Sequence, residues 1–488
     1  MQLSLLLQKN SEMDTTEFRD WAHKLADRMA DYYENIETVP VKSAVNPGDI
    51  FSKLPTCPPD QSENMALIMD DFEQIIMPGI THWQSPNFFA YFPANASYPS
   101  ILAEMLTATL GAQCMVWDTS PAAAELEEMM MQWLKAMTGL PTDWHGVIQD
   151  TASTSTLAAL LCAREKHTAY SINKNGFNGN EKLRVYCSEE AHSSVEKAVK
   201  ITGIGQQNLV KIATDNQFRL DTKQLRDKIV KDINSGYTPL CVVAALGTTG
   251  CTAVDPLPEI AAICEESGIW LHIDAAYAGT ALLLPEYRWM IEGIEKADSF
   301  VFNPHKWMFT NFDCSAYFVK DKETLLRTFE ILPEYLKTVN RGLVNDYRDW
   351  GIPLGRRFRA LKLWFVIRSY GVKHLQDKIR EHIRLANWLE KEINANPKFE
   401  IMAPVTLSLV CFRFNPSNKT NVASLNQINE NLLGKLNATS KIFLTHTKLQ
   451  SQYTLRMSIA GTLTTEEHVA KAWELIKETA KSIEKDWV

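Results

Sequence analysis

Residues 240–279 read LCVVAALGTTGCTAVDPLPEIAAICEESGIWLHIDAAYAG, and this stretch decides the fold. Two apolar runs, residues 240–246 and 269–273, flank a helical pattern over residues 256–267. A strand, a helix and a second strand in this order are typical of a βαβ unit, which builds a parallel sheet. Because ligands of such sheets bind at the carboxyl ends of the strands, the residues that follow each run are candidates for a site.

The same alternation continues in both directions along the chain. Further strands are predicted at residues 146–149, 183–187, 209–213, 299–302 and 316–319, with helices at 153–166, 193–202 and 222–233. This pattern predicts an α/β domain whose mainly parallel sheet is flanked by helices. We assign it to residues 99–363.

The two ends of the chain show other patterns. Apolar residues recur at helical spacing over 15–36 and 63–77, which predicts a helical N-terminal segment at residues 1–98. This segment is too small for a core of its own, so we expect it to pack on another surface, such as a second subunit. Residues 364–488 are predicted to form a small α+β domain. It should contain a long helix through residue 393, strands at 407–414 and 453–459, and a last helix that begins at a capping box, Thr464 with Glu467.

Composition excludes several classes of protein. The chain has 488 residues, 45% of them hydrophobic and 22% charged, which excludes a collagen, a coiled coil and a largely disordered protein. The net charge is −8, and no run of basic residues indicates a nucleic-acid surface. No uncharged apolar stretch reaches the ~18 residues of a membrane span. We therefore expect a cytoplasmic protein without nucleic-acid or membrane partners.

The cysteines and the N-terminal residues favour the same location. The nine cysteines form no CxxC pair and are odd in number, which favours reduced thiols over disulfides or a metal site. Residues 1–7 are apolar but lack a basic flank, so we do not expect a signal peptide. The sequons at Asn95, Asn418 and Asn437 are then expected to be chance matches.

Polar side chains follow several of the predicted strands. They are Ser153 after residues 146–149, His192 after 183–187, Thr249 after 240–246, Asp274 after 269–273 and Lys306 after 299–302. Each has an ordinary structural interpretation when it is taken alone. An aspartate or serine commonly caps a helix, a lone histidine is usually structural, and a lone lysine is usually a solvated surface charge.

Taken together, these residues match what pyridoxal phosphate requires. A desolvated lysine amine can hold the cofactor aldehyde, and a carboxylate keeps the pyridine nitrogen protonated. A histidine stacks on the ring, and a helix N-terminus binds the phosphate. The sequence contains no Walker loop, GxSxG or HExxH motif, and Gly203-Ile204-Gly205 lacks the third glycine of a dinucleotide site.

Longer motifs resemble those of a known family. The sequences HSSVEK (192–197), DAAYAG (274–279) and NPHKW (303–307) strongly resemble the group II pyridoxal-phosphate decarboxylases, and most closely the aromatic-L-amino-acid decarboxylases. Further similar stretches are THW (81–83), FFAYFP (88–93), NFDCS (311–315) and IPLGRRF (352–358), so the resemblance covers nearly the whole chain. It implies pyridoxal-phosphate fold type I and an obligate homodimer with its active site at the subunit interface.

The resemblance also implies roles for individual residues. Lys306 would bind the cofactor covalently, Asp274 would pair with its pyridine nitrogen, and His192 would stack on its ring. Further cofactor contacts are implied for Ala152, Ser153, Thr249, Ser299, Asn303 and His305. The implied substrate pocket consists of Trp83, Tyr91, Phe92 and Pro93. Met115 stands where the family often has an aromatic residue that the partner subunit contributes to this pocket. Residues 331–342 resemble a mobile lid, in which Tyr335 would be the proton donor.

The product and the substrate follow from the same resemblance. Tyr335 together with His192 favours an amine product, and we expect Tyr335→Phe to yield an aldehyde. The sequence therefore predicts decarboxylation of aromatic L-amino acids to amines and carbon dioxide. An aromatic acetaldehyde synthase and a histidine decarboxylase remain alternatives, whereas the aromatic pocket argues against glutamate. A further alternative is a catalytically silent dimer of the same fold that serves as a binding module. A purified protein without bound cofactor would favour this alternative.

Two positions depart from the family pattern. Asp150-Thr151 stands where the family has Gly-Ser or Gly-Thr, which places a carboxylate near the phosphate site, and we expect its side chain to point away. Ala94 replaces a hydroxyl residue that many catechol-handling members carry. This weakens the preference for ring hydroxyls, which apolar pockets discriminate poorly.

Overall fold

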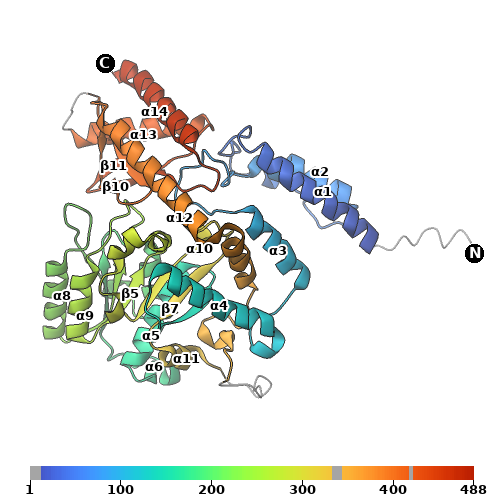
Figure 1. Cartoon of the computed structure of the whole chain (residues 1–488). Coiled ribbons are helices and arrows are strands. Elements are labelled where there is room, and N and C mark those ends of the chain that lie inside the picture. Colours follow the sequence, from blue (N-terminus) through green and yellow to red (C-terminus); the bar gives the residue numbers. More distant parts are fainter. Residues whose placement is uncertain (1–12, 332–342, 417–420, 488) are drawn as a thin grey trace, which may run out of the picture. The chain divides into compact units, whose positions relative to one another are not determined.

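The computed structural model describes residues 13–331, 343–416 and 421–487 (Figure 1). The chain divides into two compact units. The larger unit comprises Phe89–Glu430 and Thr445–Thr462, and the smaller comprises Met1–Phe88, Asn431–Leu444 and Leu463–Val488. The division into domains at residues 98 and 363 stays a prediction.

A seven-stranded sheet forms the centre of the larger unit, with strand order β1-β7-β6-β5-β4-β2-β3. The strands are β1 (His145–Gln149), β2 (Leu183–Ser188), β3 (Leu209–Ile212), β4 (Thr238–Ala245), β5 (Trp270–Asp274), β6 (Ser299–Phe302) and β7 (Ser315–Val319). The neighbours β3, β2, β4, β5 and β6 pair in parallel in that order across the sheet. Strand β7 runs antiparallel to both of its neighbours, β6 and β1. The predicted strands and the mainly parallel sheet are thus confirmed.

Helices cover both faces of this sheet. The helices are α3 (Tyr98–Leu110), α4 (Pro121–Thr138), α5 (Ala152–His167), α6 (Ser171–Asn175), α7 (Ser193–Ile201), α8 (Thr222–Asn234), α9 (Leu257–Ser267), α10 (Pro304–Trp307), α11 (Lys322–Phe329) and α12 (Arg359–Asn394). Apolar residues of α4, α8, α9 and α12 share one core, and those of α5, α7 and α11 share another. Along β4, Val242 faces the first core and Val243 the second, which explains its uninterrupted apolar run.

A second, antiparallel sheet in the larger unit has the order β10-β11-β9-β8. Its strands are β8 (Phe399–Ile401), β9 (Leu409–Phe414), β10 (Thr445–Leu449) and β11 (Gln452–Ser458). Strands β9 and β11 were predicted, and the long helix α12 ends at Asn394 as expected. Strand β8 was not predicted because it is only three residues long, and β10 was not because its sequence THTKL is mostly polar. Helix α13 (Val422–Ala438) begins in the larger unit and ends in the smaller.

The smaller unit contains the predicted N-terminal helices. Helix α1 (Thr15–Glu34) is capped by Asp14, whose carboxylate accepts hydrogen bonds from the amides of Thr16 and Glu17, both at 2.8 Å. Helix α2 (Met65–Asp71) continues through a π-helical turn, Phe72–Ile76. Within the described residues, no helix is both long and apolar enough to cross a membrane.

The predicted capping box at Thr464 is wrong. The last helix, α14 (Glu466–Trp487), begins further along the chain, and the Thr464 hydroxyl donates to the carbonyl of Pro86 at 2.9 Å. The cap is formed one residue later, where the amide of Thr465 donates to Nδ1 of His468 at 3.1 Å. Histidine is not a residue of the usual capping-box pattern, so the sequence pattern selected the wrong pair.

Candidate active site

The carboxyl ends of β4, β5 and β6 and the N-termini of α5 and α7 meet at a cavity of about 220 Å³ in the larger unit. Most of the predicted site residues line it, namely Phe92, Ala152, Ser153, His192, Thr249, Asp274, Asn303, His305 and Lys306. These residues are spread over more than 200 positions of the sequence. The parallel sheet brings them together because its strands end at one common edge.

Lys306 lies on the single turn α10, directly after β6. Its Nζ is 5.4 Å from the ring centroid of Phe92. Burial lowers the pKa of the Lys306 amine, an effect that Asp274 opposes and Arg456 reinforces. A lowered pKa increases the fraction of neutral amine, which is the form that attacks a carbonyl.

The carboxylate and the imidazole of the site are fixed by local hydrogen bonds. At the end of β5, Oδ1 of Asp274 accepts a hydrogen bond from the amide of Ala276 at 3.0 Å. His192 caps α7, with its Nδ1 accepting from the amide of Ser194 at 3.2 Å. Burial lowers the pKa of His192, so the ring is neutral near pH 7 and carries its proton on Nε2. A flat, neutral ring with a fixed tautomer therefore lines the cavity.

Hydrogen-bond donors gather at another wall of the cavity, where α5 begins. Ala152 and Ser153 form the first turn of α5, whose free amides make an anion site. Nδ1 of His305 accepts from the amide of Cys314 at 2.9 Å, and burial lowers the pKa of His305 to about 3, so its neutral ring keeps the proton on Nε2. Oδ1 of Asn303 accepts from the hydroxyl of Ser315 at 2.7 Å, which leaves the amide hydrogens of Asn303 as donors.

This set of groups fits pyridoxal phosphate. The amine of Lys306 and the carboxylate of Asp274 have the chemistry that its aldehyde and pyridine nitrogen require. The α5 N-terminus supplies the donors that its phosphate requires. Among the described residues, no cluster of histidine, cysteine or acidic side chains is suited to a metal ion.

The structure does not bring Ser299 into this cavity. Ser299 is the first residue of β6, fully buried, and its hydroxyl accepts from the indole of Trp270 at 3.0 Å and contacts Nδ1 of His272 at 2.9 Å. It lies at the other end of the strand from Asn303. Its geometry therefore gives no support to the predicted cofactor contact.

Other predicted residues also lie outside the lining of the cavity. Tyr91 is exposed and Pro93 is buried, although both flank Phe92. Trp83 belongs to the smaller unit, where its ring packs on Phe88 with centroids 4.5 Å apart. The carbonyl of Met115 accepts from the amide of Arg348 at 2.9 Å. Tyr335 lies outside the described residues.

An aromatic stack that forms one wall of the cavity was not predicted. The ring of Phe92 stacks on Tyr277 with centroids 3.9 Å apart, and Tyr277 stacks on Trp307 at 4.7 Å. The indole of Trp307 donates to Nδ1 of His382 in α12 at 3.0 Å. Tyr277 and Trp307 were both present in the quoted motifs, but nothing in the sequence indicated that their rings meet. The stack gives the cavity a rigid apolar wall.

Arg456 on β11 was also missed. Its guanidinium donates to the carbonyls of Thr249 at 2.7 Å and Gly250 at 2.9 Å, and to the hydroxyl of Thr445 at 3.0 Å. It thereby fixes the turn that carries Thr249 into the cavity. The only sequence signal was an arginine within an apolar run.

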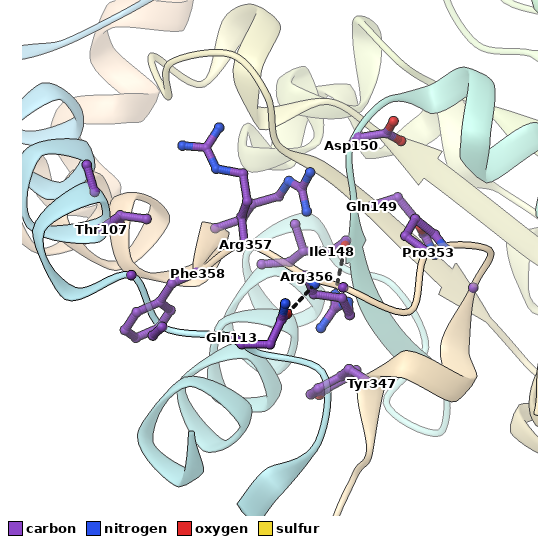
Figure 2. A pocket seen from close by; sticks show the side chains of 16 residues that line it. Thr107, Gln113, Ile148, Gln149, Asp150, Tyr347, Pro353, Arg356, Arg357 and Phe358 are labelled. Carbon is purple, nitrogen blue, oxygen red and sulfur yellow. Dashed lines mark hydrogen bonds between the residues drawn. The ribbon is translucent and has the colours of Figure 1, made fainter. Parts of the chain in front are cut away.

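Asp150 lines a separate cavity of about 420 Å³ (Figure 2). Its carboxylate accepts from the amide of Thr151 at 2.6 Å. Figure 2 shows Arg356 and Arg357 among the residues around this second cavity. The expectation that the Asp150 side chain points away from the phosphate site stays a prediction, since its carboxylate is bound at Thr151, the residue before α5.

Comparison with known proteins supports this interpretation of the site. The family model described as the pyridoxal-dependent decarboxylase conserved domain matches residues 47–415. The chain is 44% identical to phenylacetaldehyde synthase of Arabidopsis thaliana over 96% of both chains. It is also 44% identical to aromatic-L-amino-acid decarboxylase of Rattus norvegicus, over 96% of this chain and 99% of the relative.

Solved structures agree with the sequence comparison. Tryptophan decarboxylase of Catharanthus roseus in complex with L-tryptophan superposes with a TM-score of 0.91 at 40% identity, over 96% of this chain and 99% of that one. The Oryza sativa enzyme TDC with PLP and tryptamine gives a TM-score of 0.93 at 35% identity, with the same coverage. The expected fold type I is thereby confirmed. The chain belongs to the pyridoxal-dependent decarboxylase family, and it is a carboxy-lyase with pyridoxal phosphate as its cofactor.

Proposed function

We propose that this enzyme converts aromatic L-amino acids to the corresponding amines and carbon dioxide. The observation that carries the proposal is the single cavity in which Lys306, Asp274 and His192 meet the N-terminus of α5, with Phe92 on its wall. The relatives named for tryptophan, tyrosine and aromatic L-amino acids support an aromatic substrate.

Each residue of the cavity has a distinct task in this proposal. When bound, pyridoxal phosphate supplies an electron sink for the electron pair that remains when the substrate carboxylate leaves as carbon dioxide. Lys306 would hold the cofactor through its aldehyde until the substrate amine takes its place. Asp274 keeps the pyridine nitrogen protonated, and His192 holds the ring by stacking. Ser153, Asn303 and His305 bind the phosphate together with the first amides of α5.

The apolar wall supports an aromatic side chain in the substrate. Phe92 is held by its stack on Tyr277, so a flat ring can pack on a surface that does not need to rearrange. No arginine is among the described residues that line the cavity. This lining supports an aromatic rather than an acidic side chain in the substrate.

The product depends on where the proton is delivered after carbon dioxide leaves. We assign delivery of this proton to Tyr335, which lies outside the described residues, and this assignment favours an amine. The likeness to phenylacetaldehyde synthase of Arabidopsis thaliana supports an aromatic aldehyde as the alternative product. Formation of the aldehyde consumes oxygen and releases hydrogen peroxide, so the two products are readily distinguished.

We further propose a cytoplasmic homodimer. Helix α3 exposes Tyr98, Leu102, Leu106 and Leu110, which recur every four residues and so share one face of the helix. An exposed apolar face of this kind marks a protein interface. Analytical ultracentrifugation should give twice the mass of one chain, and Leu106→Glu should weaken the association. A wild-type protein that sediments as a monomer would contradict this part of the proposal.

The deciding experiment measures all products at once. Purified, cofactor-loaded enzyme is incubated with tryptophan, tyrosine, phenylalanine, dihydroxyphenylalanine, histidine and glutamate, and carbon dioxide, amine, aldehyde and peroxide are quantified. We expect equal amounts of carbon dioxide and amine from aromatic substrates only. Aldehyde with peroxide would contradict the product, and turnover of histidine or glutamate alone would contradict the substrate class. Lys306→Ala should lower the rate by on the order of a thousandfold.

A further inference from the structure

The side chain of Asn95 connects three segments of the larger unit. Its Nδ2 donates to the carbonyl of Lys306 at 2.6 Å and to that of Ala460 at 2.8 Å. Its Oδ1 accepts from the amide of Thr462 at 3.0 Å and from the Thr462 hydroxyl at 3.1 Å. Both amide hydrogens and both lone pairs are thus used, and the residue is only 2% exposed. This burial also removes the Asn95 sequon as a glycan acceptor in the folded protein.

The hydrogen bond from Asn95 satisfies the carbonyl of Lys306, which has no donor within its own short helix. Helix α10 is a single turn, Pro304–Trp307, and the carbonyls of a last helical turn have no partner within the helix. The amide of Asn95 supplies the donor for the carbonyl of Lys306. Two residues later, the hydroxyl of Ser97 donates to the carbonyl of Phe309 at 2.7 Å. The segment 95–97 therefore holds the backbone on both sides of the turn that follows Lys306.

The same segment also carries part of the cavity wall. Phe92 lies three residues before Asn95 and lines the cavity opposite the amine of Lys306. Residues 460–462, the second segment that the Asn95 side chain binds, lie just after β11, which carries Arg456. The Asn95 amide is therefore placed to fix the position of the Lys306 backbone relative to both Phe92 and Arg456.

We infer that Asn95 is a positioning residue for Lys306, which fixes the lysine backbone so that its amine stays directed into the cavity. The inference rests on the role proposed for Lys306. Asn95 does not line the cavity, so it acts only through the backbone of Lys306. A misplacement of about 1 Å at a reacting group can lower a rate by about a hundredfold, so the loss of this contact should have a measurable effect on the rate.

The test is Asn95→Asp, with Asn429→Asp as the matched control. Asn429 is fully buried, and its Nδ2 donates to the carbonyls of Phe414 at 2.9 Å and Leu425 at 2.8 Å, but it does not line the cavity. In both variants a carboxylate oxygen replaces the donor and faces two carbonyl oxygens, so both should melt at lower temperature. We expect only Asn95→Asp to lower kcat by about tenfold or more, with a smaller change in KM.

A second readout does not depend on turnover. Cofactor-loaded protein is titrated with base while the visible absorption band of the cofactor is followed, because this band reports the environment of the bound aldehyde. We expect the midpoint of the titration to shift in Asn95→Asp and to stay unchanged in Asn429→Asp. Unchanged kcat and midpoint in Asn95→Asp would overturn the inference. If Asn95→Asp does not fold, Asn95→Ala removes the donor without adding a charge, and the same two readouts decide.

Failure of the inference can be separated from failure of the proposed function. The wild-type protein is reduced with borohydride, and peptide mass spectrometry locates the cofactor. We expect the cofactor on Lys306. Attachment to another lysine would overturn both the proposed role of Lys306 and the inference. Attachment to Lys306 together with an unaffected Asn95→Asp enzyme would overturn the inference alone.

Discussion

Arg456 places a positive charge close to Lys306. Its hydrogen bonds to Thr249, Gly250 and Thr445 all go to neutral oxygens. Arg456 is 4% exposed, and burial lowers its pKa. The charge lowers the pKa of the Lys306 amine, and the hydrogen bonds hold the turn at Thr249 and Gly250. This single residue thus contributes to the electrostatics of the cavity and to the position of its wall.

Replacing Arg456 should affect both properties. Arg456→Met keeps most of the side-chain length but leaves the carbonyls of Thr249 and Gly250 without their charged donor. We expect the free energy of unfolding to fall by about 2–4 kcal/mol, because each hydrogen bond to a charged group contributes about 1.5–3 kcal/mol and such effects are not additive. Urea unfolding of the apo-protein measures this, with Arg456→Lys as the control that keeps the charge. A methionine variant as stable as the wild type would contradict the prediction.

At the scale of elements, a buried ion pair joins α4 to the segment that follows residue 350. Nη1 and Nη2 of Arg356 donate to the two carboxylate oxygens of Glu127 at 2.9 and 2.6 Å. The same groups also bind β1, since the amide of Ile148 donates to Glu127 at 2.8 Å. Arg356 also donates to the Ile148 carbonyl at 2.7 Å (Figure 2). The pair therefore ties a helix, a strand and a loop beside the second cavity.

Breaking this pair should destabilise the fold strongly. Glu127→Gln leaves the buried charge of Arg356 without its counter-ion, which should lower the free energy of unfolding by about 3–5 kcal/mol. The double variant with Arg356→Met should lose less than the sum of the two single variants, because the partners interact directly. Chemical denaturation of the four proteins measures the coupling. Additive effects, or a loss no larger than that of breaking the exposed Arg226–Glu266 pair, would argue against it.

At the scale of the whole molecule, buried histidines make stability depend on pH. Burial lowers the pKa of His272 to about 4, and lowers those of His305 and His382 to about 3. An unfolded histidine has a pKa of about 6.5. Between these values the unfolded chain binds more protons than the folded protein, so the folded state loses stability as the pH falls below about 6.5.

The size of this effect can be tested at one histidine. Each of these residues should lower the free energy of unfolding by up to about 1.4 kcal/mol per pH unit between pH 6.5 and 4.5. His382→Gln keeps an acceptor for the indole of Trp307 but cannot be protonated, so its stability should fall less steeply with acidification. Thermal melts over this range measure the slope, with the exposed His374→Gln as the control. Equal slopes in the wild type and in His382→Gln would contradict the prediction.

The candidate site could be predicted where its residues follow a strand closely. Lys306, Asp274 and His192 lie within a few residues of a strand end, and the parallel sheet brings those ends to one edge. Ser299 shows the limit of this argument. At about 3.3 Å per residue, the four-residue strand β6 places Ser299 roughly 10 Å or more from Asn303, at the opposite edge of the sheet.

The sequence by itself determined the succession of strands and helices and the residues at each strand end, because these depend on hydrophobic periodicity over short stretches. Only the tertiary structure decided which distant segments meet. The bond from Asn95 to Lys306, the bonds from Arg456 to the turn at Thr249, and the stack of Phe92 on Tyr277 are all of this kind. They depend on where separate segments of the chain cross, and local periodicity carries no information about those crossings.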